Sequence, residues 1–264
     1  NWVDVDFIQP LSLKDNRIRQ GRLLQERFAQ FLNILNSSGP GVNLDYRLDD
    51  KFIVLYSGNI GLTQPMQEVI KAAKRLVDLP QIHFVIVGPA NRLAELWADC
   101  QAYQLNNVTL SPFVERADLP ELLAAANVSL VVQKRNVISF NMPSKIQTIS
   151  ASGRPIIAAV PKEGTAAQAV LKSGGGVWVP PEDAEALAGA IAHLYHHPQE
   201  AEQLGEKARR YALEQYSYQR ALDRYEALFQ EVCSPRSQPA ATARTTPPPQ
   251  SPASGTKPSN ASTQ

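Results

Sequence analysis

One short stretch contains the residue types that bind phosphate. Pro143, Ser144 and Lys145 stand where a short helix should begin, and the spacing of Ile146 and Ile149 gives that helix one apolar side. The free N–H groups at a helix start attract an anion, and a lysine beside them adds a full positive charge. The stretch therefore predicts an anion-binding site, with a solvated helix lysine as the alternative.

A glycine-containing loop is the second candidate. Gly58 and Gly61 lie in residues 57–65, directly after a predicted strand, where glycine lets the backbone approach a ligand closely. The loop lacks the third glycine and the downstream acidic residue of the dinucleotide-binding fingerprint. It is either a ligand-binding loop of another kind or a turn that simply needs glycine.

Both stretches lie where predicted strands alternate with predicted helices. We expect strands at 52–56, 82–87, 108–110, 128–132, 156–160 and 176–179, and helices at 66–77, 91–103 and 119–126. Strands that are apolar throughout, separated by helices, indicate a parallel sheet covered on both faces. We therefore predict an α/β fold, a doubly wound Rossmann-like sheet with its ligand at the carboxyl ends of the strands.

The flanking segments differ from this alternating region. Residues 1–47 contain one amphipathic stretch, Gln20–Leu35, which predicts a helix. Residues 48–233 form the predicted domain, and its last part is helical at 183–197, 198–216 and 218–232. Residues 234–264 contain seven prolines and neither Asp nor Glu, so we expect a disordered tail.

Composition excludes several classes of protein. The formal charge of +1 gives no reason to expect a nucleic-acid partner. Cys100 and Cys233 are too few for a disulfide framework or a metal site. No apolar run approaches the 18 residues of a transmembrane helix, so we expect a cytoplasmic protein, with the inner membrane surface as an alternative location.

The blocks Pro-Ser-Lys at 143–145 and Ala-Ser-Gly-Arg-Pro-Ile-Ile-Ala at 151–158 resemble the donor site of the family 4 glycosyltransferases. These are retaining enzymes of the GT-B type, and the resemblance is to members that make colanic acid and exopolysaccharide. It spans residues 1–233 and implies the C-terminal, donor-binding half of such an enzyme. The opening Asn-Trp-Val-Asp is similar to the phrase that closes the family's N-terminal domain, so we expect an acceptor-binding half to be missing.

The resemblance also implies which residues bind the donor, a nucleotide diphosphate sugar. They are Gly58, Asn59, Ile60, Gly61, Gly88, Phe113, Val114, Asn141, Pro143, Ser144, Lys145 and Thr148. Two glutamates of the family are replaced by Phe140 and Thr148, and Gln64 stands where a cation is usual, so catalytic residues are not assigned. The family needs no metal or other cofactor.

The implied reaction is transfer of a sugar from the donor to a glycan or lipid-linked acceptor, with retention of configuration. The acceptor would be held by the missing domain or by a partner chain. Three alternatives remain: a non-catalytic nucleotide-sugar-binding subunit or degenerate copy, a GT-B-shaped epimerase of nucleotide sugars, and an ordinary NAD-dependent Rossmann enzyme. The fold alone does not decide among them.

Overall fold

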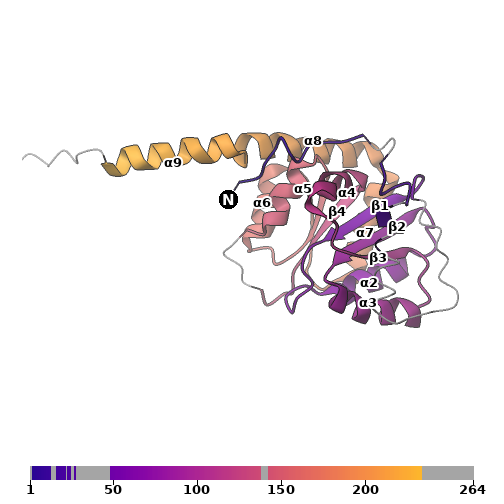
Figure 1. Ribbon diagram of the computed structural model, residues 1–264. Helices are drawn as coiled ribbons and strands as arrows, with labels where there is room; N and C mark the ends of the chain where they lie inside the picture. The colour runs from indigo at the N-terminus through magenta and orange to yellow at the C-terminus, as the bar shows by residue number, and fades with distance from the viewer. Residues whose placement is uncertain are drawn as a thin grey trace, which may run out of the picture.

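The computed structural model describes residues 2–12, 16–21, 23, 24, 27, 48–137 and 142–233. Their centre is a six-stranded parallel sheet in the order β3-β2-β1-β4-β5-β6 (Figure 1). The strands are β1 (Phe52–Ser57), β2 (Ile82–Gly88), β3 (Val108–Pro112), β4 (Val128–Val132), β5 (Ile156–Ala159) and β6 (Gly176–Val179). The strand order reverses between β1 and β4, which is where sheets of this kind bind ligands. The predicted Rossmann-like doubly wound α/β fold is confirmed.

The middle strands β1, β4 and β5 are buried because they consist mostly of apolar residues. Every residue of β4 and β5 is buried, as are the first five residues of β1. Apolar side chains on both faces of a strand require cover on both faces, which a parallel sheet between two helix layers provides. β1 pairs with β4 so that Leu55 lies beside Ser129, and both residues reappear in the site below.

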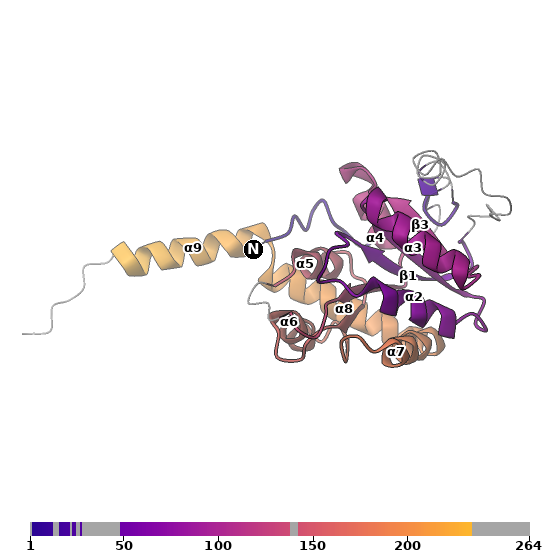
Figure 2. The ribbon, with the colours of Figure 1, turned by 90° about the horizontal axis from the view of Figure 1, so that it is seen from below.

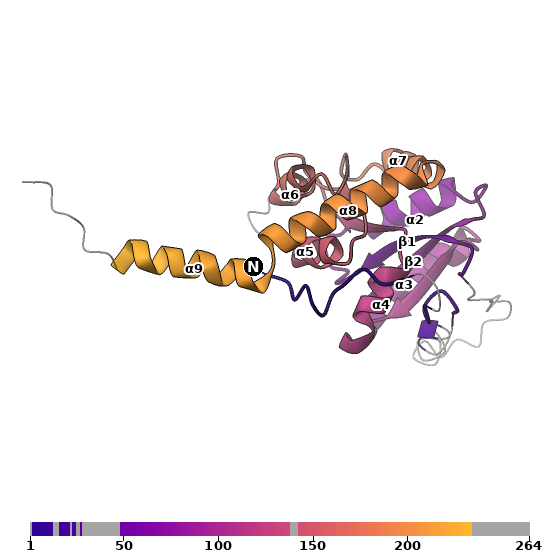
Figure 3. The ribbon, with the colours of Figure 1, turned by 90° about the horizontal axis from the view of Figure 1, so that it is seen from above.

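Helices cover the sheet on both faces. They are α2 (Met66–Arg75), α3 (Ala90–Ala102), α4 (Leu119–Ala125), α5 (Ser144–Ala151), α6 (Thr165–Ser173), α7 (Ala184–His196), α8 (Pro198–Gln215) and α9 (Tyr218–Cys233), with a 3-10 turn, η1 (Arg116–Asp118). α2 packs against α3 and α7, and α8 packs against α5, α6 and α7. Figures 2 and 3, which view the molecule from below and from above, both show α8 running past α5 and α7.

The predicted strands and helices within 48–233 agree with the structure to within two residues at each end. Helix α6 was not among the predicted elements. The amphipathic helix predicted at 20–35 falls mostly on residues outside the described part of the chain, although Leu23 and Leu24 are buried in the core. The tail predicted at 234–264 lies outside the described residues altogether.

The N-terminal segment lies against the end of α8 and the start of α9. The backbone N–H of Val3 donates to the carbonyl oxygen of Tyr216 over 2.8 Å, and the rings of Trp2 and Tyr218 are 4.9 Å apart. All three views show α9 running away from the rest of the domain (Figures 1, 2 and 3). The start of the described chain and the junction of α8 with α9 therefore lie side by side at one edge of the domain.

Candidate functional site

A pocket of about 390 Å³ lies at the carboxyl end of β1 and beside the start of β4, between α4 and α5. Its lining comes from four separate parts of the chain. The lining residues are Leu55, Ser57, Gly58, Asn59, Gln64, Phe113, Leu119, Leu123, Ser129, Ser144, Lys145, Thr148 and Ile149. This is the position where the sheet topology predicts a ligand.

One end of the pocket is formed by the start of α5. Pro143 occupies the N-cap position and makes no side-chain hydrogen bond to the helix. The first N–H groups of a helix have no partner within the helix, and Ser144 and Lys145, the first two residues of α5, both line the pocket. At the other end of α5, Gly153 has a φ of 69° and ends the helix as its sequence predicts.

The Lys145 ammonium is the positive charge at this end. Its Nζ lies 4.2 Å from the centre of the Tyr56 ring, a cation–π contact. Burial lowers the pKa of Lys145 to about 8. No carboxylate of a described residue forms an ion pair with it, so its charge is held in a poorly hydrated place without a counter-ion. An anion in the pocket would supply one.

The loop after β1 packs directly onto this lysine. Gly58 has a φ of 147°, and a Cβ atom there would lie 2.7 Å from Nζ of Lys145. The hydroxyl of Tyr56 donates to the carbonyl oxygen of Asn59 over 2.6 Å, and the N–H of Gly61 donates to Oε1 of Gln64 over 3.0 Å. The loop is thereby fixed in a shape that only glycine at position 58 allows.

Arg92 supports the same loop from outside the pocket. Its Nε donates to the carbonyl oxygen of Ile60 over 3.1 Å, and its Nη1 lies 2.8 Å from Oε1 of Glu95. A Cβ atom on Gly88 would lie 2.6 Å from Cδ1 of Ile60. Gly88 therefore makes room for the loop rather than lining the pocket itself.

The other end of the pocket is an apolar slot. It is lined by Phe113, by Leu119 and Leu123 of α4, by Ile149 of α5 and by Leu55 of β1. An apolar lining of this kind accepts an aromatic ring such as a nucleobase.

The slot contains one polar side chain without a partner. Ser129 is 1% exposed, and its Oγ has no hydrogen-bond partner among the described residues. A buried hydroxyl without a partner costs free energy, which makes this group a candidate to bond a ligand. The Thr148 hydroxyl, by contrast, donates to the carbonyl oxygen of Ser144 over 3.3 Å.

The charge distribution restricts the chemistry of the pocket. Lys145 is the single charged residue among the described lining residues, and none of them is a carboxylate. In the described part of the chain, no group of three or more His, Cys, Asp or Glu side chains is placed to hold a metal ion. The arrangement can bind an anion at one end and an apolar ring at the other.

Comparison with known proteins identifies the family. Residues 45–211 match the family described as "Glycosyl transferases group 1". The chain belongs to the group 1 glycosyl transferases. It is 40% identical over 144 residues to WcaI of Escherichia coli (strain K12), whose name assigns it to colanic acid biosynthesis as a glycosyl transferase; the match covers 54% of this chain and 35% of WcaI. The chain spans less than half the length of the curated relatives it matches.

Solved structures share the fold. The Anabaena protein Alr3699/HepE, in complex with UDP and glucose, superposes with a TM-score of 0.63 at 18% identity, covering 86% of this chain and 55% of that one. The C-terminal domain of LpcC, a group 1 family protein from Francisella tularensis, superposes with a TM-score of 0.57 at 17% identity and is covered over 99% of its length. The domain is thus a GT-B-type domain of a group 1 glycosyl transferase.

In this group 1 domain, the structure brings six of the predicted donor-binding residues together in the pocket lining: Gly58, Asn59, Phe113, Ser144, Lys145 and Thr148. The others that are described, Ile60, Gly61, Gly88, Val114 and Pro143, stand behind or beside the lining residues. Asn141 and Phe140 lie outside the described residues.

Sequence reasoning did not assign seven lining residues of the group 1 domain to the site: Leu55, Ser57, Gln64, Leu119, Leu123, Ser129 and Ile149. Most are apolar and look like ordinary core positions in a sequence. Ser129 carried a usable signal, because it is the one polar residue in the strand Val-Ser-Leu-Val-Val. In the part of the chain that the structure describes, no helix has the length and apolar composition needed to span a bilayer.

Proposed function

We propose that this domain binds the nucleoside diphosphate part of a sugar donor. The observation that supports the proposal is the Lys145 ammonium, buried beside the Gly58 loop at the start of α5 and lacking a counter-ion among the described residues. A diphosphate fits this end because it supplies negative charge to the ammonium and acceptors to the N–H groups. The apolar slot, with Phe113 and Ser129, suits the base.

The proposed reaction is transfer of the sugar to a glycan or lipid-linked acceptor with retention of configuration. The leaving diphosphate gains negative charge as the sugar departs. Lys145 and the start of α5 would stabilise that charge in a pre-arranged position, which is an effective way to accelerate such a step. This chain would supply the donor half of the site, and the acceptor would be held by protein outside it. HepE, a relative in fold, is named as a complex with UDP-glucose.

A second candidate is a domain that binds a nucleotide sugar without transferring it. The feature that favours it is the lack of a carboxylate among the described lining residues. The two functions share the binding step and differ in turnover. A donor that binds but releases no sugar to any acceptor, even when the complete natural protein is supplied, would favour the binding function.

Lys145→Ala tests the binding site. The substitution removes a charge-assisted bond of about 1.5–3 kcal/mol and should weaken UDP binding roughly tenfold to a hundredfold, because 1.4 kcal/mol is about one decade. Uridine, which has no phosphate, should bind the variant and the parent alike. Isothermal calorimetry and NMR titration measure the two affinities.

Lys172→Ala is the matched control, because Lys172 is an exposed lysine in the last turn of α6. It should leave both affinities unchanged. Equal UDP affinities of the parent and Lys145→Ala would show that Lys145 is an ordinary buried lysine. The proposed phosphate site would then be wrong.

A further inference from the structure

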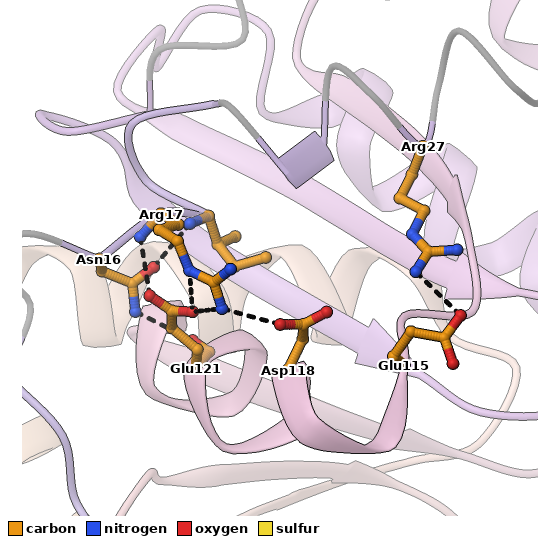
Figure 4. Close-up of polar contacts among 7 residues, drawn as sticks. Asn16, Arg17, Arg27, Glu115, Asp118 and Glu121 are labelled. Carbon is orange, nitrogen blue, oxygen red and sulfur yellow. Dashed lines mark hydrogen bonds and ion pairs between the residues drawn. The ribbon is translucent and has the colours of Figure 1, made fainter.

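Residues 16–19 form hydrogen bonds with one side of helix α4. The opposite side of the helix contributes Leu119 and Leu123 to the pocket lining. Figure 4 shows Asn16 and Arg17 reaching toward Glu121 and Asp118. We call Asn16, Arg17 and Arg19 the α4 clamp. The clamp comes from the segment before β1, about 100 residues away from α4 in sequence, and no lining residue of the pocket belongs to it.

Arg17 makes the charged part of the clamp. Its Nε donates to Oε2 of Glu121 over 2.7 Å, and its Nη2 donates to Oδ1 of Asp118 over 2.7 Å. Its backbone N–H donates to Oε1 of Glu121 over 3.0 Å. These contacts raise the pKa of Arg17 above its usual value, the hydrogen bond to Glu121 most of all. One arginine thus joins the 3-10 turn before α4 to the first turn of α4.

Asn16 and Arg19 hold the backbone of the same helix at both ends. Nδ2 of Asn16 donates to the carbonyl oxygen of Glu121 over 2.9 Å, and Nε of Arg19 donates to that of Ala125 over 3.0 Å. Nη2 of Arg19 also donates to Oδ1 of Asn127 at the start of β4. Both side chains are buried. The clamp therefore spans α4 from its first turn to its last residue.

The turn before α4 is held from the same side. Nη2 of Arg27 lies 3.0 Å from Oε1 of Glu115 (Figure 4). The guanidinium of Arg116 lies over the ring of Phe7, 5.5 Å from its centre. Described residues on both sides of 13–15 thus contact the segment that joins Phe113 to α4.

α4 depends on such contacts because it is weak by itself. It has seven residues, and a helix of this length is not stable alone in water. Asp118 occupies the N-cap position but makes no side-chain cap hydrogen bond, and its carboxylate accepts from Arg17 instead. The Asp118 carboxylate, which could cap α4, therefore bonds the clamp and not the helix N-terminus.

The clamp and the pocket lie on opposite sides of α4. Leu119 and Leu123 are four residues apart, so they share one side of the helix, and both line the pocket. Glu121 is two residues from each of them and faces away, toward Arg17. A shift of α4 after a change in the contact with Arg17 would therefore move the two leucines as well.

We propose that Arg17 is a positioning residue for the nucleotide: it sets the place of α4 and with it the width of the apolar slot. This inference rests on the proposed function, because the slot matters only if a nucleotide enters it. The two carboxylates that Arg17 bridges are mostly shielded, whereas the Arg17 side chain is half exposed. Replacing Arg17 leaves these two shielded carboxylates without their cation and lowers the stability of the domain, so both probes are titrated well below the melting temperature of the variant.

Arg17→Met is the test, with UDP and uridine as probes. The variant should bind both probes more weakly by the same factor, about threefold to tenfold, as expected for the loss of one half-exposed ion-pair network. Lys145→Ala should weaken UDP alone. The double variant should show the sum of the two effects on UDP, because the residues act on opposite ends of the pocket.

A salt titration separates positioning from mere stability. Uridine is uncharged, so its own binding has little reason to respond to salt. Salt screens the half-exposed pairs of Arg17, so the affinity of the parent for uridine should fall as salt rises, and that of Arg17→Met should stay constant. Arg224→Met is the matched control: Arg224 is an exposed arginine on α9 that bonds Gln215, and its loss should change neither affinity nor salt response.

Two results would overturn the inference, and they differ from each other. If the parent binds UDP and uridine and Arg17→Met binds both equally well, α4 is positioned without Arg17, and the proposed function stands. If the parent binds neither probe, the proposed nucleotide site fails, and the inference fails with it. Equal weakening of both probes together with the lost salt response would support the inference.

Discussion

At the scale of single residues, Ser129 is the least expected member of the site. Its side chain lines the apolar slot, and its hydroxyl has no hydrogen-bond partner among the described residues. Ser150, in α5, has the same kind of hydroxyl but does not line the pocket. The two serines therefore allow the cost of an unpaired hydroxyl to be separated from a role in binding.

Ser129→Ala should leave the free domain as stable as the parent or more stable, because it removes an unpaired buried hydroxyl worth about 1–3 kcal/mol. It should weaken UDP and uridine binding about twofold to tenfold if the hydroxyl bonds the base. Ser150→Ala is the control, with a similar effect on melting temperature and none on affinity. Unchanged uridine affinity in Ser129→Ala would show that the hydroxyl is never used.

Lys145 gives the binding site a pH dependence of defined sign. Burial lowers its pKa from 10.5 in the unfolded chain to about 8 in the folded domain. The unfolded chain thus holds more protons between pH 8 and 10.5, and stability should rise with pH across that window. The penalty for burying the charged lysine is fully present below pH 8.

UDP binding should depend on pH in the opposite direction. A bound diphosphate favours the charged lysine and raises its pKa, so above pH 8 the complex must take up a proton to form. The UDP affinity should therefore fall as pH rises above 8, where the phosphates themselves are already ionised. Calorimetry in two buffers of different ionisation enthalpy measures the proton uptake. Lys145→Met should show neither uptake nor pH dependence, and uptake that persists in it would assign the proton to another group.

At the scale of elements, the sequence predicted most of the fold because the signals are local. A strand such as Ile82–Gly88 is apolar at every position except His83, and a helix start such as Pro143 or Pro198 is marked by its own residue. α6 was missed because two of its three buried residues, Ala166 and Ala167, are alanines, so large apolar side chains do not mark its buried side. The turn at Gly174, with a φ of 60°, was the available signal for its end.

The site was less predictable than the fold, since its contacts join distant parts of the chain. The sequence pointed to Lys145 and Gly58 separately, but their direct contact depends on how α5 sits beside β1. Arg17 and Glu121 are 104 residues apart in sequence, so no local pattern around either residue predicts their contact. Apolar lining residues such as Leu119 and Leu123 have the same pattern as core residues.

At the scale of the whole molecule, α9 stands apart from the domain. No residue of α9 is buried, and Tyr225, Leu228, Phe229 and Val232 are all more than half exposed on it. Their spacing of three and four places them on one side of the helix. In all three views α9 extends away from the body of the domain, beyond the contact of Trp2 with Tyr218 (Figures 1, 2 and 3).

Removing residues 218–264 should therefore leave the melting temperature and the UDP affinity of the domain close to those of the full chain. Stability comes mainly from buried apolar area, and α9 buries little against this domain. The removal should also reduce self-association at high concentration, because an exposed apolar side is lost. Differential scanning calorimetry, UDP titration and analytical ultracentrifugation measure the three quantities.

A second chain ending at Cys233 isolates the contribution of residues 234–264, which composition predicts to be none. The Tyr216→Ala variant is the positive control, because Tyr216 packs on the core beside Met142 and its loss should lower the melting temperature. A clear drop in melting temperature on removing 218–233 would mean that α9 folds back onto the domain in solution.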